Sequence, residues 1–252
     1  DATVGGNHKV YLLKDHLDRF YSSAAALDIK IPMEKAALGK LLTELLEQVE
    51  GQTHFVYWQV TRGAAARNHV YSEDMKGKLW VMIRPNKLKD PEQPIRLITR
   101  EDTRFYHCNI KTLNLLPSVM ASEEAAKAGA DETVFHRGEI VTECAHSNVS
   151  ILKDGVFISH PNDNLILRGI SKTHMIQACY ELGIQVMERP FTLEELRQAD
   201  EIIVTSSSNF CLHAESVDGV KAGGKDPVTL KRIQDAVIGE YLEYTGKDSI
   251  FD

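Results

Sequence analysis

Lys111 is the residue whose surroundings most directly suggest covalent chemistry. It stands in Asn109–Leu116, where most of the neighbouring side chains are apolar. An ammonium group is costly to desolvate, and desolvation lowers its pKa, which suits a lysine to attack a carbonyl carbon and form a Schiff base. Taken alone, the segment favours a simpler interpretation, in which the amine reaches water from the end of a strand.

Glu143 is a second candidate. It lies among small polar residues in Val141–Asn148. A carboxylate in such a place could keep a pyridine nitrogen protonated, so that the ring acts as an electron sink. Taken in isolation, Glu143 is more simply interpreted as a solvated turn residue.

Three further segments could bind a phosphate group. Ser171 stands at an expected helix start, where backbone N–H groups and a hydroxyl can donate to an anion. Thr205–Ser208 follows an expected strand and offers further donors, among them Ser206 and Ser207. Arg19 could add charge-assisted hydrogen bonds. Each has an ordinary alternative, namely a helix cap, a polar loop or a surface arginine.

Arg67 and His69 are candidates of a third kind. They stand two residues apart in an expected loop. A guanidinium with an imidazole nearby could bind the carboxylate of a small substrate. Both could equally be solvated loop residues without a role.

The first part of the chain is expected to contain two helices and two strands. Apolar residues at helical spacing predict a helix capped by Asp15 and a second one between Pro32 and Gly51. Aromatic and β-branched residues predict strands at 54–62 and 79–83.

The remainder is expected to form a second domain. Residues 85–94 hold prolines and charges without periodicity, which indicates a linker between a smaller α/β domain at 1–84 and a larger domain at 95–252. The smaller domain is expected to lack its first strands, since strand-like residues begin at once. The larger domain mixes expected hairpins with helices, which predicts an α+β fold. Its expected helices are 117–128, 171–182, a short one capped by Thr192 with Glu195, and one that starts at Pro227.

Composition argues against several classes of protein. The formal net charge of −7 argues against nucleic acid or an anionic membrane as a partner. No apolar run has the length of a membrane span, and no secretory segment opens the chain. The 4 cysteines contain no CxxC pair, which indicates reduced thiols in a cytoplasm and no metal site.

The order of these motifs along the chain resembles the fold-type IV family of pyridoxal-phosphate enzymes. That family contains D-amino-acid aminotransferases, branched-chain aminotransferases and aminodeoxychorismate lyases. The matching segments cover nearly the whole chain, so the resemblance does not depend on one pattern. They are His16–Tyr21, Ile110–Asn114, Val141–Glu143, Ser147–Val149, Leu167–Ser171 and Val204–Ser207.

The resemblance assigns a role to most of the candidates. It implies that Lys111 holds pyridoxal 5′-phosphate as a Schiff base and moves a proton at the substrate Cα. It implies that Glu143 contacts the ring nitrogen and that Leu167 packs against the ring. It also implies a homodimer whose larger domain binds the cofactor. The residues it assigns to the phosphate are Arg19, Ile170, Ser171, Ser206 and Ser207.

The expected substrate follows from a carboxylate-binding loop. Val60–His69 resembles the loop of D-amino-acid aminotransferases in which an Arg-x-His pair, here Arg67 and His69, binds the α-carboxylate. A fixed carboxylate decides which face of Cα meets Lys111, and hence which enantiomer reacts. The resemblance therefore implies transfer from D-alanine to 2-oxoglutarate, giving pyruvate and D-glutamate. A lyase or a branched-chain aminotransferase of the same family, and a non-catalytic cofactor-binding relative, are the alternatives.

Three features depart from the family pattern. The family has a few dozen residues ahead of the position of Asp1, including a tyrosine that helps to hold the carboxylate. His146 stands where small hydroxyl residues are usual, and Asn209–His213 differs from the usual sequence after the phosphate loop. These departures bear on substrate range more than on cofactor binding, because the cofactor motifs themselves are present.

Overall fold

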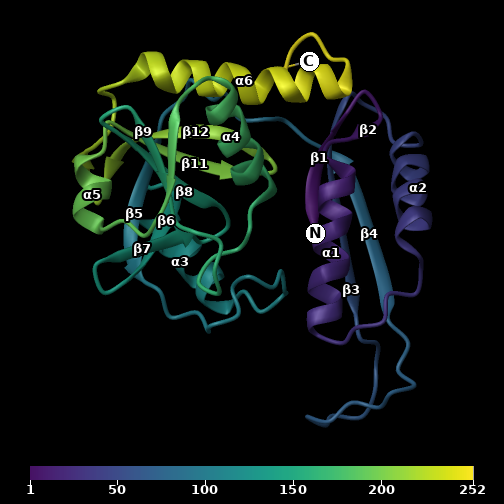
Figure 1. Ribbon diagram of the computed structural model, residues 1–252. Helices are drawn as coiled ribbons and strands as arrows, with labels where there is room; N and C mark the ends of the chain where they lie inside the picture. Colours follow the sequence, from purple (N-terminus) through teal and green to yellow (C-terminus); the bar gives the residue numbers. More distant parts are fainter. Residues whose placement is uncertain (252) are drawn as a thin grey trace. The chain divides into compact units, whose positions relative to one another are not determined.

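The protein is described from a computed structural model, which covers residues 1–251 (Figure 1). The chain folds into two compact units. Unit 1 comprises Asp1–Leu88 together with the C-terminal segment from Tyr241, and unit 2 comprises Lys89–Glu240. The change from one unit to the other at Leu88 falls within the expected linker at 85–94. The segment from Tyr241 belongs with unit 1, whereas the sequence placed it in the larger domain.

Unit 1 is an antiparallel sheet of four strands, in the order β2-β1-β3-β4, with two helices packed on it. The helices and strands share one core, in which Trp58 and Val56 are fully buried. The rings of Phe20 and Trp58 pack edge-on in this core, with their centroids 6.2 Å apart. The elements are β1 (Ala2–Gly6), β2 (Lys9–Val10), α1 (Leu13–Ala26), α2 (Lys35–Leu46), β3 (Thr53–Thr61) and β4 (Lys78–Pro85).

The start of α1 differs from the prediction. Asp15 was expected to cap the helix, but α1 begins at Leu13 and its N-cap is Leu12, which has a φ of 50°. Asp15 therefore lies in the first turn, where its charge is favourable next to the positive end of the helix dipole.

Unit 2 is built around a mixed sheet of nine strands, in the order β10-β9-β8-β11-β12-β5-β6-β7, with β13 paired to β12. Consecutive residues of the central strands are buried, for example Ile151 with Leu152 and Ile202 with Ile203, so both faces of these strands are covered. The strands are β5 (Ile95–Glu101), β6 (Glu132–Arg137), β7 (Ile140–Cys144), β8 (Asn148–Lys153), β9 (Val156–Ser159), β10 (Gln185–Glu188), β11 (Glu201–Ser206), β12 (Asn209–Val217) and β13 (Val220–Lys221).

The sheet of unit 2 is strongly curled (Figure 1). The strand β7 is at one edge of the pairing order, yet only residues 145–147 separate it from β8, which lies in the interior of that order. A link that short requires the edge to bend back toward β8. The side chains at the end of β7 and at the start of β8 are thereby brought together.

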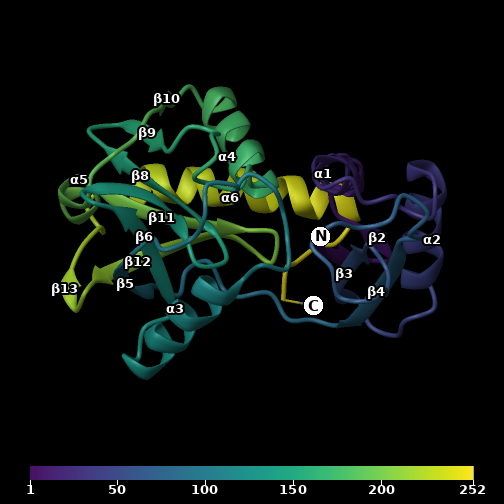
Figure 2. The same cartoon turned by 90° about the horizontal axis from the view of Figure 1, so that it is seen from below.

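Helices of unit 2 begin and end close to the predicted residues. The capping box of Thr192 and Glu195 is present, as predicted. Figure 2 shows α4 running next to β10, with which it is in contact. None of the helices within residues 1–251 combines the length and the apolar character that a membrane span requires. The helices are α3 (Leu116–Lys127), α4 (Ile170–Glu181), α5 (Leu193–Gln198) and α6 (Pro227–Thr245), the last of which ends among the residues of unit 1.

Candidate active site

Glu143 is buried near the end of β7, and donors surround its carboxylate. Arg104 Nη1 donates to Oε1 at 2.5 Å, and Asn148 Nδ2 donates to Oε2 at 2.8 Å. The backbone N–H of Leu167 lies 3.1 Å from both oxygens. Since all these partners donate, the arrangement matches an ionised carboxylate, which only accepts hydrogen bonds.

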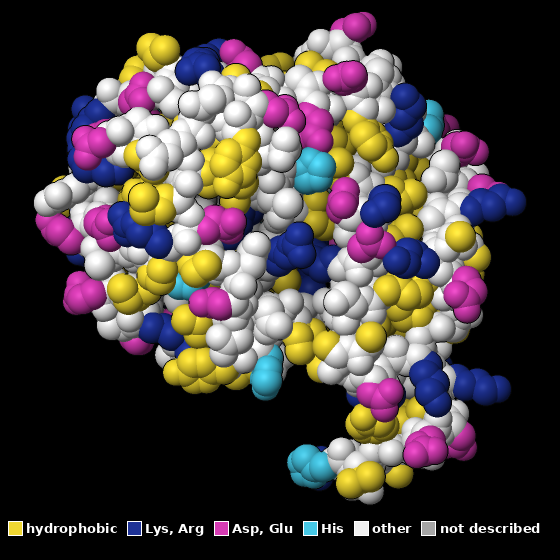
Figure 3. Space-filling model, viewed as in Figure 1, with side chains coloured by type: hydrophobic (Ala, Val, Ile, Leu, Met, Phe, Trp, Pro, Cys, Tyr) yellow, Lys and Arg dark blue, Asp and Glu magenta, His cyan; other side chains and the backbone are white. Residues whose placement is uncertain are grey.

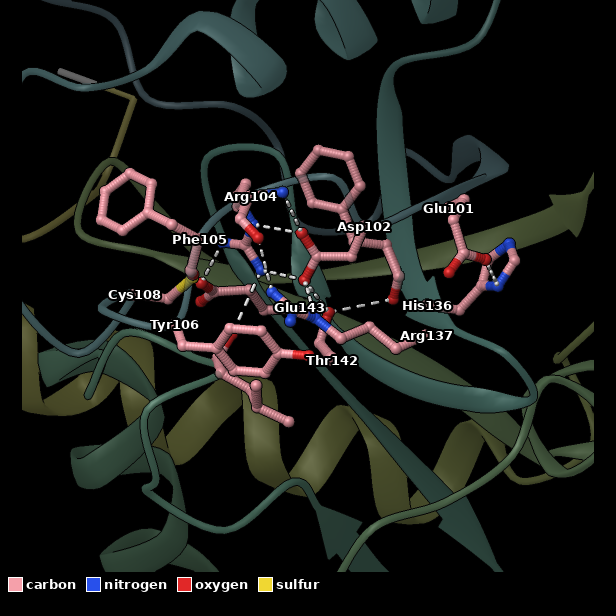
Figure 4. Close-up of polar contacts among 12 residues, drawn as sticks. Glu101, Asp102, Arg104, Phe105, Tyr106, Cys108, His136, Arg137, Thr142 and Glu143 are labelled. Atoms are coloured by element: carbon pink, nitrogen blue, oxygen red, sulfur yellow. Dashed lines mark hydrogen bonds and ion pairs between the residues drawn. The ribbon is translucent and has the colours of Figure 1, made fainter.

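Arg104 connects Glu143 to a second buried carboxylate, that of Asp102 (Figure 4). Arg104 donates to Asp102 from Nε and Nη2, both at 2.9 Å, and its guanidinium lies 4.8 Å from the ring centre of Phe135. Arg137 and Thr142 also donate to Asp102. Nothing in the sequence indicates this network, because Arg104 and Asp102 lie in a coil with neither periodicity nor a motif.

The ionisation of Glu143 depends on two opposing effects. Burial raises the pKa of Glu143 to about 7, although the charge and the hydrogen bond of Arg104 and the N–H of Leu167 favour the ionised form. Burial lowers the pKa of Arg104, but hydrogen bonds and charge from Asp102 and Glu143 outweigh this and raise it above its ordinary value. Arg104 is therefore a fixed cation, and Glu143 is the member of the pair that can change its charge near neutral pH.

The start of α4 and the end of β11 are brought together through Asn148. The helix begins after Gly169, which makes no side-chain cap, so the first N–H groups of α4, including those of Ile170 and Ser171, point out of the helix end. A Cβ built on Gly169 would lie 1.9 Å from Asn148 Oδ1, so only glycine allows this approach. Asn148 is in turn the register partner of Thr205, the residue before Ser206. Donors from two distant segments therefore converge on one end of the sheet.

Thr205 and its neighbours offer further donors at this end of the sheet. The hydroxyl of Thr205 is buried and makes no hydrogen bond within the described part of the chain. Ser206 Oγ lies 3.4 Å from Ser208 Oγ, and Ser207 occupies the turn between β11 and β12. A buried hydroxyl without a partner is costly, and an anion that accepts its hydrogen bond would remove that cost.

Lys111 lies in the loop between β5 and α3 and is exposed in the single chain. The expected desolvation of its amine is therefore not a property of the chain alone, because its apolar neighbours Leu113 and Leu115 are themselves 58% and 48% exposed. Lys172, by contrast, is almost completely buried. Its amine donates to the carbonyl of His160 at 2.6 Å and to Asn162 Oδ1 at 3.1 Å, and burial lowers its pKa.

The other predicted residues lie in unit 1. Arg19, on α1, donates to the buried carboxylate of Asp1 from Nε at 3.1 Å and from Nη2 at 2.8 Å. His16 Nδ1 lies 2.7 Å from the same carboxylate. The guanidinium of Arg19 is therefore held in a fixed orientation by two hydrogen bonds from one side.

Arg67 and His69 lie in the loop that joins β3 to β4, and both are exposed. The loop is attached to the segment after α1, since the guanidinium of Arg62 stacks on Tyr71 at 3.5 Å and Tyr71 donates to Asp28. Figure 3 shows charged, histidine and hydrophobic side chains exposed along this loop, at the lower right.

The residues of unit 2 fit pyridoxal phosphate on chemical grounds. The phosphate would meet uncapped helix N–H groups and the hydroxyls at the end of β11, including that of Thr205, which has no hydrogen-bond partner among residues 1–251. A protonated ring nitrogen would meet the buried Glu143, which can accept its hydrogen bond. Within residues 1–251, no group of three His, Cys, Asp or Glu side chains is arranged to hold a metal ion.

Comparison with known proteins places this arrangement in context. The family model described as "Amino-transferase class IV" matches residues 3–217. A relative from Listeria monocytogenes serotype 4b, strain F2365, named D-alanine aminotransferase, is 42% identical over 232 residues, which are 89% of this chain and 80% of the relative.

Solved structures with the same fold are more distant in sequence. The branched-chain amino acid aminotransferase of Escherichia coli has a TM-score of 0.85 at 22% identity and covers 95% of this chain and 83% of its own. A T.th. branched-chain amino acid aminotransferase, solved with pyridoxamine 5′-phosphate, has a TM-score of 0.83 at 23% identity. The match covers 97% of this chain and 87% of that structure's chain. At such identities the likeness concerns the fold.

Proposed function

Because this chain belongs to the class IV aminotransferases, we propose that it transfers the amino group of D-alanine to 2-oxoglutarate, giving pyruvate and D-glutamate. The predicted fold-type IV family, its α+β fold and its enzyme class, a pyridoxal-phosphate-dependent aminotransferase, are confirmed. The name of the Listeria relative supports the D-amino-acid branch over a lyase or a branched-chain aminotransferase.

The surroundings of Glu143 are the observation that carries the proposal. Pyridoxal phosphate, when bound, supplies an electron sink for negative charge at the substrate Cα, and that sink depends on a protonated ring nitrogen. Glu143 is buried and held by Arg104 and Asn148, so it would keep the proton on that nitrogen. Leu167, whose N–H binds Glu143, would pack against the ring.

Phosphate binding is assigned to several segments. In unit 2, the start of α4 and the turn after β11 would donate to one phosphate, which the uncapped helix start and the register of Asn148 with Thr205 support. Arg19 is proposed to add a positive charge to phosphate binding. The residues proposed to bind phosphate are Ile170, Ser171, Ser206, Ser207 and Arg19.

Lys111 is proposed to hold the cofactor aldehyde and, once displaced by the substrate amine, to remove and return the proton at Cα. Arg67 and His69 would bind the substrate α-carboxylate. A carboxylate held in one place presents a single face of Cα to Lys111, which would select the D-enantiomer.

A substrate panel tests the proposed reaction. With pyridoxal phosphate and 2-oxoglutarate, D-alanine should give pyruvate at least about a hundredfold faster than L-alanine. In Arg67→Gln the KM for D-alanine should rise about ten- to fiftyfold, because one charge-assisted hydrogen bond to a carboxylate is lost. Coupled assay of pyruvate measures both quantities.

A matched control and three contrary results bear on the proposed reaction. Arg84→Gln removes an exposed arginine from β4 and should leave the KM unchanged. Faster reaction of L-alanine would reject the D-specific proposal, and pyruvate formed from aminodeoxychorismate without any oxo acid would indicate the lyase. Cofactor binding with no turnover on D- or L-amino acids would indicate a non-catalytic relative.

We propose that the working protein is a homodimer, built on an apolar surface of unit 2. Large apolar side chains on both sides of Lys111 in the sequence are exposed, which is unusual for a surface that stays in contact with water. A second copy packed on this surface would also remove water from Lys111. The exposed residues are Phe105, Tyr106, Leu113, Leu115, Leu116, Val119 and Met120.

A charge placed in this surface should break the dimer. In Leu116→Glu, burial of an unpaired carboxylate should raise the dissociation constant at least about a hundredfold. Light scattering coupled to gel filtration would then report one chain, where the natural sequence gives two. Val228→Glu is the matched control, because Val228 is 71% exposed on α6 and outside the surface. A natural protein that runs as one chain at all concentrations contradicts the proposal.

We place the enzyme in the cytoplasm. Its cysteines at 108, 144, 179 and 211 are all unpaired, which suits a reducing compartment. Its proposed partners are small amino and oxo acids, with no nucleic acid or membrane.

A further inference from the structure

The loop that joins β3 to β4 is closed at its base by two glycines. Gly63 has a φ of 113°, and a Cβ built on it would lie 2.6 Å from the carbonyl oxygen of Lys76, at the other end of the loop. A Cβ built on Gly77 would collide with the carbonyl oxygen of Lys30, which follows α1. Only glycine allows such approaches, so the two ends of the loop lie close together. Its middle extends beyond the ends of both strands (Figure 1).

Arg62 joins the start of this loop to the end of α1. Its guanidinium donates to the carbonyl of Asp28 from Nη1 at 2.7 Å and to the carbonyl of Leu27 from Nη2 at 2.6 Å. The last carbonyls of a helix have no partner within it and lie at the negative end of the helix dipole, where a cation is favourable. Because both Nη groups donate to neighbouring carbonyls, the plane of the guanidinium is fixed.

Tyr71 closes the loop over that guanidinium. The centre of its ring lies 3.5 Å from Arg62 Cζ, and its hydroxyl donates to Asp28 Oδ2 at 3.1 Å. Arg67 and His69, the pair proposed to bind the substrate carboxylate, lie between Arg62 and Tyr71 in the sequence. We call Arg62, Tyr71 and Asp28 the loop clasp, since they hold together the two chain segments on either side of that pair.

Asp28 contributes to the clasp in an unfavourable backbone conformation. It follows the C-cap residue Leu27 and has a φ of 52°, in the left-handed region that favours glycine. Its carbonyl accepts from Arg62, and its carboxylate accepts from Tyr71. A glycine would end the helix at least as well, but it would leave the Tyr71 hydroxyl without this acceptor. The aspartate side chain therefore serves the loop rather than the helix.

We propose that the loop clasp positions Arg67 and His69 for the substrate carboxylate and thereby contributes to selection of the D-enantiomer. The inference rests on the proposed function of that pair. Both residues are exposed, and an exposed loop loses conformational entropy when a ligand orders it. A loop that is closed at its base has fewer conformations to lose. The clasp residues act through the loop, so they are positioning residues.

Tyr71→Ala tests the clasp without removing a buried group, because Tyr71 is 43% exposed. In the cofactor-free variant, trypsin should cut after Arg67 about five- to tenfold faster than in the natural protein, because ring stacking and a hydrogen bond no longer hold the loop closed. In the loaded enzyme the KM for D-alanine should rise by a similar factor, while kcat changes less than about twofold. The preference for D- over L-alanine should fall about three- to tenfold. Mass spectrometry identifies the cut, and the coupled assay of pyruvate gives the kinetic values.

Asp28→Gly separates the clasp from the end of the helix. Glycine suits the left-handed conformation, so this variant should not unfold at a lower temperature than the natural protein. It still removes the acceptor of the Tyr71 hydroxyl, so cleavage after Arg67 and the KM for D-alanine should both rise about two- to threefold. Tyr180→Ala is the matched control, because Tyr180 is 57% exposed on α4, and it should change neither quantity.

Unchanged cleavage and an unchanged KM in Tyr71→Ala overturn the inference. Faster cleavage with an unchanged KM also overturns it, because the clasp then has no part in substrate binding. Arg67→Gln, assayed alongside, separates this failure from failure of the proposed function. A raised KM in Arg67→Gln alone rejects only the positioning role of the clasp, whereas an unchanged KM in both variants rejects carboxylate binding by the loop and the inference with it.

Discussion

Replacement of Lys111 by alanine should lower the rate of transamination at least about a thousandfold, because it removes both the attachment point of the cofactor and the base that acts at Cα. The visible absorbance of the loaded protein should also be lost. Borohydride reduction of the natural protein with its cofactor should place a pyridoxyl group on the peptide that contains Lys111. Circular dichroism should show that Lys111→Ala keeps its fold, because the side chain is exposed in the chain.

Lys172 provides the critical comparison. Its amine is buried and burial lowers its pKa, which are the properties usually sought in a reactive lysine. However, it donates to the His160 carbonyl and to Asn162, and it lies 3.5 Å from Glu188, so its charge is used to satisfy buried acceptors. Lys172→Met should leave the pyridoxyl label on Lys111. In the natural protein, recovery of the label on the peptide that contains Lys172 would falsify the assignment.

Arg104→Gln should reduce transamination about a hundredfold at pH 6 and less at pH 8. Arg104 favours the ionised form of Glu143. Its removal therefore raises the pKa of Glu143 above the value of about 7 that it has in the natural protein. A smaller fraction of Glu143 is then ionised at any pH below that new value, and the ring nitrogen loses its acceptor. The acidic limb of the kcat profile should therefore move to higher pH.

Arg137→Gln is the matched control for Arg104. Arg137 also donates to Asp102, at 3.2 Å, but no hydrogen bond joins it to Glu143 in the described structure. Its removal should leave the acidic limb in place. In Glu143→Gln the limb should disappear, because the titrating group is gone. An unmoved limb in Arg104→Gln would show that Glu143 does not control the rate.

The sequence predicted those parts of the fold that depend on neighbouring residues. Thr192 and Glu195 form the expected capping box because both hydrogen bonds close within one helical turn. The predicted start of α1 was wrong, because Leu12 adopts a left-handed backbone conformation. A leucine rarely adopts that conformation, so its presence in the sequence does not predict a helix N-cap.

Residues of the candidate site could be predicted from the sequence only where they belong to a family motif. Glu143 and Leu167 are predicted from family motifs, whereas Arg104, which donates to Glu143 directly, is not, because 39 positions separate the two and no spacing connects them. The exposure of Lys111 shows a second limit of sequence reasoning. Apolar neighbours such as Leu113 and Leu115 indicate that a surface avoids water, but not whether the same chain or another one covers it.

The link between β7 and β8 is only three residues long, and this limits which sequence changes the enzyme can accept there. Within six consecutive positions the chain supplies Glu143, His146 and Asn148, and the curl of the sheet depends on the same three-residue link. One inserted residue would have to be absorbed within this link, because a shift of β8 by one residue against β11 would turn Asn148 to the opposite face of the strand, away from both Glu143 and Gly169. The link between β7 and β8 can therefore exchange side chains, as at His146, while its length stays constant. New substrate preferences in this lineage are expected to arise there by substitution rather than by insertion.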